Sequence, residues 1–309
     1  MKLKNKKILV TGGNGFLGKH VVSKLRSYGA TNILVFHSKE YDLLERSNCQ
    51  LLVKDVDLVI HLAAQVGGIG YIDDHPGEMF YKNAVMGIEL MEASRKAKVK
   101  KFVCIGTACE YPAILPLPFK EDDIWNGYPE DTTAPYGLAK KILMVQGNAY
   151  KKQYGLNVIH LIPVNLYGPG DTFNNTSAHV IPSLIKKIID ARSKNKKSVD
   201  VWGSGSATRE FLYVEDAAEG ILQAALKYND TKPLNLGTGV ETSIKEVTEI
   251  IMELANYKGS IRWNHKKPDG QPRRALDVSR AKRMGFVAKT SLRGGLKKTI
   301  KWYLEQFEK

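Results

Sequence analysis

A glycine-rich turn near the N-terminus constrains the fold of this 309-residue chain more than any other feature. The apolar run 8–10 leads directly into Gly12-Gly13-Asn14-Gly15-Phe16-Leu17-Gly18, and an amphipathic stretch to about Tyr28 follows. This order predicts a buried strand, a tight turn and a helix. The glycines let the backbone approach a pyrophosphate closely and direct the helix N-terminus at its charge. These seven residues are therefore candidate ligands of a dinucleotide.

The end of the second predicted strand, residues 31–36, is where the cofactor's ribose is expected. A carboxylate there would bond the ribose hydroxyls of NAD, and a cation would accept the 2′-phosphate of NADP. Ser38 and Lys39 favour NADP, although Glu40 follows and Lys39 could be a solvated surface lysine. NADP(H) is the expected cofactor.

Further strands at about 56–62, 101–106 and 157–162 alternate with helices at about 78–98 and 135–154, which is typical of a doubly wound sheet. The stretch 41–54 is poorly patterned. Residues near the strand ends are expected to border the dinucleotide: Asp42, Leu43, Ala63, Ala64, Ile105 and Gly106. Asp42 could equally be an ordinary turn carboxylate.

The expected fold class is α/β: a Rossmann-like doubly wound parallel sheet with a smaller mixed α/β C-terminal substrate domain. We expect residues 1–165 to form the dinucleotide-binding domain, with a returning segment near 208–238. Residues 166–207 and 239–309 then form the substrate-binding domain. Within it, Ser243 and Glu246 make a capping box that opens a helix.

Two pairs of residues are candidates for catalytic roles. Tyr136 and Lys140 lie one helical turn apart on the same face. The ammonium can lower the phenol pKa from its usual value of about 10, so that Tyr136 exchanges a proton near neutral pH. Thr107 and Cys109 follow a predicted buried strand, at the sheet edge where such folds place chemistry. Together these pairs supply a hydride-transfer acid and a thiol that can move protons on carbon.

The chain resembles the extended short-chain dehydrogenase/reductases, and within them the GDP-L-fucose synthase branch. The general likeness rests on the glycine turn, His61 to Ala64, Asn83, and Tyr136 with Lys140. The specific likeness covers nearly the whole chain, through the segments VGGI at 66–69, TACEYP at 107–112, PVNLYGP at 163–169, SAHVIP at 177–182, VWGSG at 201–205, REF at 209–211 and KPDGQPR at 267–273.

The resemblance implies one active site that acts twice on a GDP-linked 4-keto-6-deoxy-D-mannose: epimerisation at C3 and C5, then NADPH reduction of the C4 ketone. The ketone acidifies the neighbouring carbons, so a base and an acid on opposite faces invert each through an enolate. By resemblance, Cys109 is the base and His179 the acid. Tyr136 bonds the C4 oxygen, stabilises the enolate and finally protonates the alkoxide. Thr107, where serine is usual, also bonds that oxygen.

The resemblance also implies binding contacts. Lys140 bonds the nicotinamide ribose, and His179 borders the cofactor. Nicotinamide and sugar meet at Pro163, Val164, Asn165 and Leu166, and Asn165 contacts the substrate as well. The remaining GDP contacts are Lys187 (in place of the more usual arginine), Trp202, Arg209 and Asp269. In this superfamily the helices near 83–97 and 135–153 pair across a dimer axis, so a homodimer is implied.

Ordinary structural roles remain open for several of these residues. Taken alone, Cys109 and His179 would be structural, Trp202 could pack the second domain, and Asp269 could cap a turn. Cys104 is expected to be a buried small hydrophobe and Cys49 a loop thiol. The chain could also process another GDP-keto sugar, of the colitose or heptose type, or epimerise without reduction. A non-catalytic NADP-sensing protein is the alternative from another class.

Bulk properties favour an ordinary cytoplasmic protein. Only three apolar residues follow the basic N-terminus before the glycine turn, and no apolar run approaches a membrane span. Three cysteines without metal-like spacing favour a reduced protein with no metal site. Residues 181–309 carry 25 basic and 15 acidic side chains, and so +10 of the net charge of +14. Without interleaved aromatics, this excess favours a solvated basic face or a pocket for an acidic small molecule over nucleic acid.

Overall fold

The computed structural model describes residues 3–174, 178–266 and 270–307. Its main element is a six-stranded parallel sheet in the order β2-β1-β3-β4-β5-β9. Because β2 and β3 flank β1, the order of the strands reverses at β1, where sheets of this kind bind ligands. The strands are β1 (Lys7–Thr11), β2 (Asn32–Leu34), β3 (Leu58–His61), β4 (Lys101–Ile105), β5 (Asn157–Pro163) and β9 (Leu234–Leu236).

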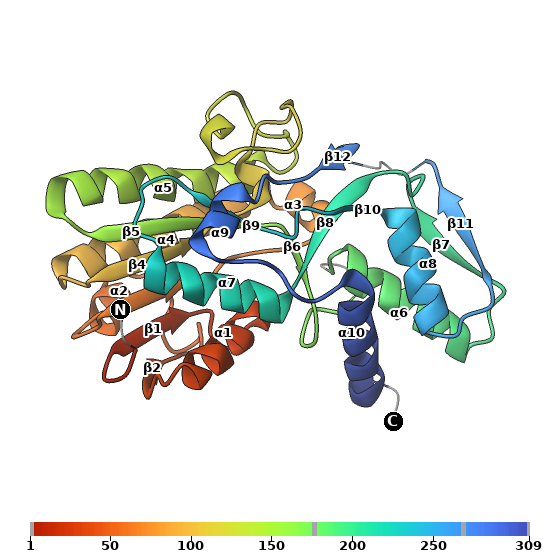
Figure 1. The fold of residues 1–309 in the computed structure, drawn as a ribbon, viewed down its shortest axis with the longest axis horizontal. Helices are drawn as coiled ribbons and strands as arrows, with labels where there is room; N and C mark the ends of the chain where they lie inside the picture. Colours follow the sequence, from red (N-terminus) through yellow and green to blue (C-terminus); the bar gives the residue numbers. More distant parts are fainter. Residues whose placement is uncertain (1–2, 175–177, 267–269, 308–309) are drawn as a thin grey trace.

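Helices cover both faces of this sheet (Figure 1). One face carries α1 (Phe16–Ser27) and α7 (Val214–Lys227), which pack on each other. The other carries α2 (Arg46–Leu52), α4 (Pro76–Lys96) and α5 (Ala134–Tyr154). Alternate strand residues enter the two cores, since side chains of a strand alternate between its faces: Ile8 and Val10 pack with α1, and Leu9 packs with α4. The predicted α/β doubly wound fold is confirmed.

The poorly patterned stretch 41–54 contains the helix α2, which the sequence did not reveal. Cys49 lies in this helix rather than in a loop, is fully buried, and its Sγ donates to the Leu43 carbonyl oxygen at 3.4 Å. With only seven residues, α2 is too short to display a helical period. Three further short helices are α3 (Ile69–Asp74), η1 (Ala108–Glu110) and η2 (Glu121–Asp123).

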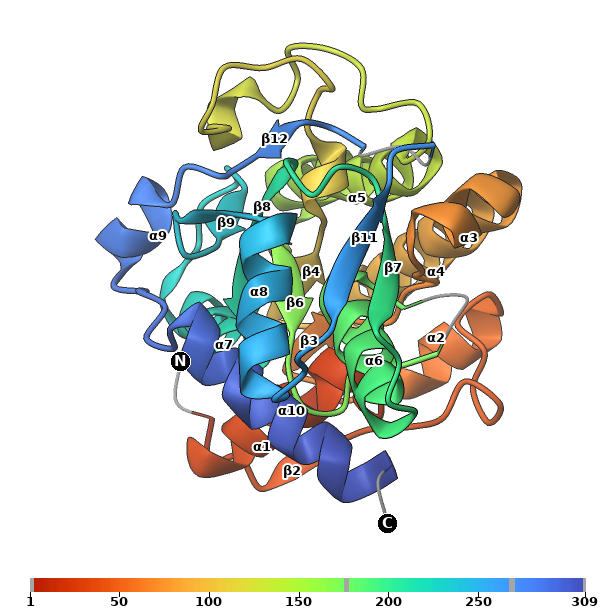
Figure 2. The ribbon, with the colours of Figure 1, turned by 90° about the vertical axis from the view of Figure 1, so that its right-hand side faces the viewer.

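A second group of elements packs around its own core at one end of the molecule (Figures 1 and 2). Its helices are α6 (Val180–Ser193), α8 (Ile244–Leu254) and α10 (Leu292–Phe307). The strand β8 (Thr208–Tyr213) pairs with β6 (Asn165–Tyr167), β10 (Glu241–Ser243) and β12 (Arg273–Arg274). A parallel pair is formed by β7 (Ser198–Trp202) and β11 (Ser260–Asn264). Ser243 Oγ accepts a hydrogen bond from the Glu246 amide at 3.1 Å, and α8 begins there.

The chain returns to the large sheet through β9, which pairs with β5, and α9 (Ser279–Met284) packs near it. Within the segment 208–238, β9 pairs with the large sheet and α7 packs against it, whereas β8 pairs within the smaller sheet. The division of the chain at 165, 207 and 239 stays a prediction.

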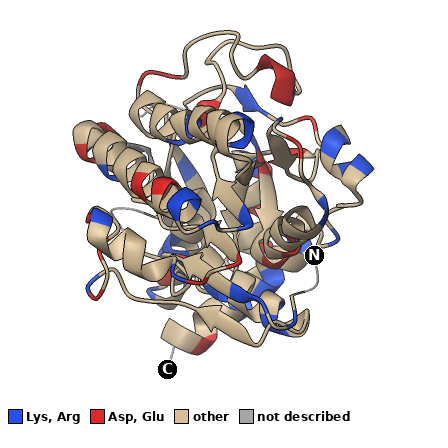
Figure 3. Cartoon of the chain, turned by 90° about the vertical axis from the view of Figure 1, so that its left-hand side faces the viewer, with Lys and Arg blue, Asp and Glu red and all other residues tan. Residues whose placement is uncertain are grey.

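Acidic and basic residues occur on the same helices, coloured red and blue in Figure 3. On α4, for example, Lys82 pairs with Glu78, and Arg95 and Lys96 pair with Glu92. Within the described residues, no helix combines the length and apolar character needed to cross a bilayer.

Candidate active site

One cavity of about 1190 Å³ runs from the glycine turn to β7 and β8. Among the predicted site residues, Gly13 is not part of its wall and Asp269 lies outside the described residues. All the others line it: Gly12, Asn14, Gly15, Phe16, Leu17, Gly18, Ser38, Lys39, Asp42, Leu43, Ala63, Ala64, Ile105, Gly106, Thr107, Cys109, Tyr136, Lys140, Pro163, Val164, Asn165, Leu166, His179, Lys187, Trp202 and Arg209. The fold thus brings residues from eight segments of the chain to one space.

The glycine turn packs so closely against neighbouring backbone that two of its glycines have no room for a side chain. Gly12 has a φ of +68°, and a Cβ there would lie 2.8 Å from the Ala63 amide nitrogen. A Cβ at Gly18 would overlap the Gly12 carbonyl oxygen. With α1 beginning at Phe16, the turn presents the helix N-terminus and bare backbone to the cavity. Both features suit a pyrophosphate.

The loop after β2 forms one end of the cavity. Asn14 Nδ2 donates to the Phe36 carbonyl oxygen at 3.2 Å and so links this loop to the glycine turn. Ser38 and Lys39 line the cavity and are exposed, so their polar groups can meet an incoming anion. Asp42 also lines it, while its Oδ1 accepts a hydrogen bond at 3.0 Å from the amide two residues on, the ordinary turn contact.

Tyr136 and Lys140 lie in the first two turns of α5 and face the cavity. Lys140 is almost completely buried. Next to it, burial and the charge of Lys140 lower the pKa of His61 to about 3. The neutral His61 ring bonds Thr11 through Nδ1 and Oγ1 at 2.8 Å. Lys140 therefore has a neutral imidazole as a neighbour, while the more distant Glu110 carboxylate favours its charged form.

The pKa of Tyr136 departs from the sequence-based expectation. Burial raises it, the nearby Cys109 and Glu110 raise it further, and a hydrogen bond with Thr107 lowers it. Burial also lowers the pKa of Lys140, which weakens the ammonium charge expected to act on the phenol. The prediction that Tyr136 titrates near neutral pH was wrong for the protein alone, since desolvation outweighs the lysine. Tyr136 is a neutral phenol that can donate a hydrogen bond or a proton.

A reciprocal cap holds Thr107 and Cys109 at the end of β4. Thr107 Oγ1 accepts from the Cys109 amide at 3.2 Å, and Glu110 Oε1 accepts from the Thr107 amide at 2.8 Å. A Cβ at Gly137 would overlap the Cys109 carbonyl oxygen, so η1 touches the first turn of α5. Sequence reasoning missed Glu110, although its spacing from Thr107 is that of a capping box.

His179 is the N-cap residue of α6 and so belongs to the smaller group of elements. It lines the cavity. Its side chain is exposed to the cavity, and the surrounding walls displace enough water to lower its pKa. The imidazolium form is thereby a stronger acid than in water. His179 and Cys109, 70 positions apart in the chain, line the same cavity.

The far end of the cavity combines an aromatic surface with cations. Trp202 is 58% exposed, so it does not pack the core of the second domain. Lys187 Nζ lies 6.0 Å from the centre of the Trp202 ring and donates to the Asp200 carbonyl oxygen at 3.4 Å. Arg209 on β8 lines the same region, and its Nη1 donates to the backbone carbonyl of Thr208 at 2.7 Å.

Three further polar residues line the cavity beside Cys109, and the sequence did not single them out: Glu130, Gln271 and Arg274. Arg274 Nη1 lies 3.6 Å from Cys109 Sγ, and its Nε donates to Gln271 Oε1 at 2.8 Å. Arg274 Nη2 forms an ion pair with Glu130 at 3.6 Å. No local pattern signals a contact between segments this far apart in the chain.

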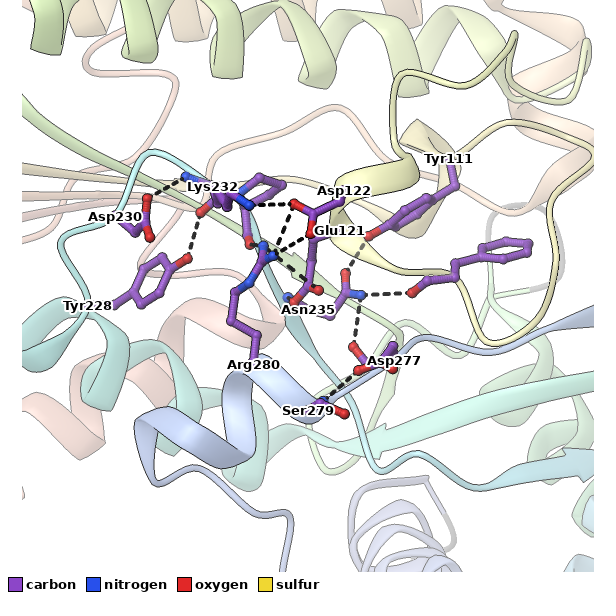
Figure 4. A network of polar contacts seen from close by, with 12 residues as sticks. Tyr111, Glu121, Asp122, Tyr228, Asp230, Lys232, Asn235, Asp277, Ser279 and Arg280 are labelled. Atoms are coloured by element: carbon purple, nitrogen blue, oxygen red, sulfur yellow. Dashed lines mark hydrogen bonds and ion pairs between the residues drawn. The ribbon is translucent and has the colours of Figure 1, made fainter.

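A network of polar contacts around Asn235 anchors the segments that carry Cys109 and Arg274 (Figure 4). Tyr111 Oη donates to Asn235 Oδ1 at 2.8 Å, and Asn235 Nδ2 donates to the carbonyl oxygens of Phe119 and Asp277 at 3.1 and 3.0 Å. Glu121 Oε1 accepts from the Asn235 amide at 3.1 Å, and Arg280 joins the network through Glu121 at 3.8 Å and also pairs with Asp122 at 3.2 Å. Tyr111 lies two residues after Cys109, and Asp277 three residues after Arg274, so the network sets their relative position.

Comparison with known proteins places this geometry in context. The model of the NAD dependent epimerase/dehydratase family matches residues 8–237. The chain is 36% identical to the GDP-L-fucose synthase of Sinorhizobium fredii (strain NBRC 101917 / NGR234), over 98% of this chain and 96% of that protein. It is 34% identical to GDP-L-fucose synthase 1 of Arabidopsis thaliana, over 99% and 95%. The crystal structure of a GDP-L-fucose synthetase from Naegleria fowleri bound to NADP superposes with a TM-score of 0.90 at 28% identity, covering 99% of this chain and 96% of that one.

Proposed function

The chain belongs to the NAD dependent epimerase/dehydratase family, and we propose that it converts GDP-4-keto-6-deoxy-D-mannose to GDP-L-fucose, with NADPH as the reductant. The relatives named GDP-L-fucose synthase, which match over nearly the whole chain, support this substrate. The observation that carries the proposal is the shared cavity, whose wall includes the thiol of Cys109, the imidazole of His179 and the phenol of Tyr136. A simple reductase needs only the last of the three.

The epimerisation uses the two proton carriers. The Cys109 thiolate removes the proton from C3, or from C5, and the electrons of the broken C–H bond move into the enolate at O4. The His179 imidazolium then donates a proton to the opposite face of the same carbon, whose inversion is complete when the ketone re-forms. The Tyr136 phenol and the Thr107 hydroxyl bond O4 and stabilise the enolate charge.

The reduction uses Tyr136 as the acid. NADPH, when bound, supplies the hydride that reduces C4. Because the pKa of Tyr136 is raised, the phenol holds its proton until O4 gains negative charge, and then transfers it to the alkoxide. Lys140, one turn further along α5, binds the nicotinamide ribose and orients it. Pro163 to Leu166 form the wall between the nicotinamide and the sugar.

The residues at the glycine turn fit a dinucleotide, since the turn lines the cavity with glycine backbone directly before the N-terminus of α1. Ser38 and Lys39 bind the 2′-phosphate of NADP. The nearby Glu40 does not oppose this choice, because its Oε2 accepts a hydrogen bond from the His37 amide at 3.1 Å. At the other end, Trp202 stacks on the guanine, and Lys187 and Arg209 neutralise the diphosphate.

The experiment that tests the proposal incubates the purified protein with GDP-4-keto-6-deoxy-D-mannose and NADPH in heavy water. We expect deuterium at C3 and C5 of the product, by mass spectrometry and NMR, together with loss of NADPH absorbance. Deuterium exchange without NADPH oxidation would leave an epimerase. Neither signal would overturn the substrate assignment, and the same assay with a colitose-type or heptose-type GDP-keto sugar would then test the alternatives. NADPH binding without turnover of any of them would indicate a sensing protein.

We also propose that the protein forms a homodimer through α4 and α5 and acts in the cytoplasm. Both helices expose large apolar side chains, namely Phe80, Tyr81, Ile88, Val145 and Tyr154. The cysteines are all free thiols, as a reducing compartment requires. Sedimentation velocity should give a dimer that Ile88→Asp combined with Val145→Asp converts to a monomer.

A further inference from the structure

Arg274 is the cation that touches Cys109. Its Nη1 lies 3.6 Å from Cys109 Sγ, within the range of a hydrogen bond to sulfur. The Arg274 side chain is only 14% exposed, so little water screens this contact. Arginine stays protonated in proteins, and a guanidinium next to a thiol favours the thiolate form.

The backbone holds Arg274 in this position from two sides. On one side, β12 pairs with β8, and Arg274 lies opposite Arg209. On the other side, the Phe119 amide donates to the Ala275 carbonyl at 2.8 Å, and the Asp277 amide donates to the Phe119 carbonyl at 2.8 Å. The guanidinium therefore does not depend on a flexible loop for its place beside the thiol.

Two side chains orient the guanidinium itself. Gln271 Oε1 accepts from Arg274 Nε at 2.8 Å, which fixes the plane of the group and leaves Nη1 directed at the sulfur. Glu130 lies 3.6 Å from Nη2 and competes with the thiol for the positive charge. Glu130 therefore opposes the effect of Arg274 on Cys109.

Other titratable groups lie near Cys109. Lys140 of α5 lines the same cavity, and burial lowers its pKa, which disfavours its charged form. From α5, Tyr136 is a neutral phenol. Glu110 of η1 is negative, but it is paired with His160 of β5 at 2.9 Å. His179 of α6 lines the same cavity, and burial lowers its pKa, which disfavours its charged form. Arg274 brings a permanent positive charge within hydrogen-bond distance of Cys109 Sγ.

We propose that Arg274 is a positioning residue of the active site, whose guanidinium bonds the Cys109 sulfur and stabilises the thiolate form that removes the sugar proton. This inference rests on the proposed role of Cys109 as the base. It predicts that Arg274 acts through the sulfur and sets the pH dependence of thiol reactivity, whether or not a substrate is bound.

The test measures the rate at which iodoacetamide alkylates Cys109 between pH 5.5 and 9.5, with the labelled peptide identified by mass spectrometry. Cys49 and Cys104 are fully buried and give a slow background. In Arg274→Gln the alkylation rate at pH 7 should fall about tenfold and its midpoint should move to higher pH. Arg274→Lys should restore part of the rate, since lysine keeps the positive charge but lacks the planar set of N–H donors of the guanidinium.

The matched control is Arg273→Gln. Arg273 is the neighbouring residue on β12, carries the same charge, and pairs with Glu241 at the surface at 2.7 Å. It should leave the alkylation profile unchanged. A wild-type profile in Arg274→Gln, or an equal shift in Arg273→Gln, would overturn the proposal.

A second variant should change the alkylation rate in the opposite direction, and it tests the proposal even if Arg274→Gln does not fold. Glu130→Gln removes the competing carboxylate, so Cys109 should be alkylated faster at pH 7 than in the wild type. An unchanged or slower rate would overturn the proposal. Deuterium exchange into GDP-4-keto-6-deoxy-D-mannose separates the two hypotheses: if the wild type shows none, the proposed function fails, while the effect of Arg274 on the thiol stands on the alkylation data alone.

Discussion

His160 Nε2 lies 2.9 Å from Glu110 Oε2, and this ion pair is buried directly behind the turn that carries Thr107 and Cys109. Burial opposes the charge on His160, but Glu110 and the neighbouring Cys104 together outweigh it and raise the pKa of the imidazole to about 10. The histidine is therefore an imidazolium at neutral pH, and Glu110 is free to bond the Thr107 amide through Oε1 at 2.8 Å.

Removing one partner of this pair should be costly. His160→Leu leaves the Glu110 carboxylate buried without a counter-charge, and we expect a loss of about 3–5 kcal/mol in the free energy of unfolding. The double variant Glu110→Leu with His160→Leu should recover much of that loss. Because the pKa of His160 is raised, the pair stabilises the fold below pH 6.5, and this contribution declines as pH rises towards 10. Urea denaturation at pH 7 and pH 9.5 measures both effects, and equal stability of the single and double variants would contradict them.

Cys109→Ser and Tyr136→Phe should divide the reaction in two. A serine hydroxyl ionises far less readily than a thiol and supplies almost no anionic base near neutral pH, so Cys109→Ser should slow deuterium exchange at C3 and C5 by about 10²-fold or more. Tyr136→Phe should remove most NADPH oxidation, because no acid then protonates O4, while exchange persists in part. Fluorescence titration should give a near-normal affinity for NADPH in both. Loss of NADPH affinity in Cys109→Ser would instead mark the thiol as structural.

Lys39 should set the preference for NADPH over NADH. Reversing its charge in Lys39→Glu removes a cation from the predicted 2′-phosphate site, so the ratio of the two dissociation constants should change by about tenfold or more. Lys152→Glu is the control, since Lys152 is exposed near the end of α5 and does not line the cavity. A ratio that is unchanged in Lys39→Glu would return Lys39 to the role of a solvated surface lysine.

The sequence predicted those parts of the site that depend on local pattern. The glycine turn, the alternation of strands and helices and the start of α8 at Ser243 each follow from residues within one or two turns of each other. The pKa of Tyr136 could not be predicted in this way, because desolvation by surrounding segments sets its direction. The contact of Arg274 with Cys109 could not be predicted either, because 165 positions separate the two residues and long-range contacts, among them the pairing of β12 with β8 and the backbone bonds of Phe119, bring them together.

Asp171, on the loop between β6 and α6 that leads to His179, should make the stability of the protein fall with rising pH. It is buried, its Oδ1 accepts from the Thr172 amide at 2.7 Å, and its Oδ2 has no hydrogen-bond partner among the residues that the structure describes. Burial raises the pKa of this carboxyl from 3.8 to about 7. Between about pH 4 and pH 7 the folded protein thus binds more protons than the unfolded chain, so stability falls across this window.

Asp171→Asn removes the titration and keeps the shape of the side chain. The wild type should lose stability between pH 4 and pH 8 relative to this variant, by up to about 4 kcal/mol at about 1.4 kcal/mol for each pKa unit. The comparison uses the change in the free energy of unfolding between pH 4 and pH 8, because burying the amide of the variant destabilises the fold equally at both pH values. Asp200→Asn, at an exposed ion pair with Arg262, is the control and should show no such trend. Parallel stability curves for wild type and Asp171→Asn from urea denaturation would show that the Asp171 carboxyl titrates alike in the folded and unfolded protein.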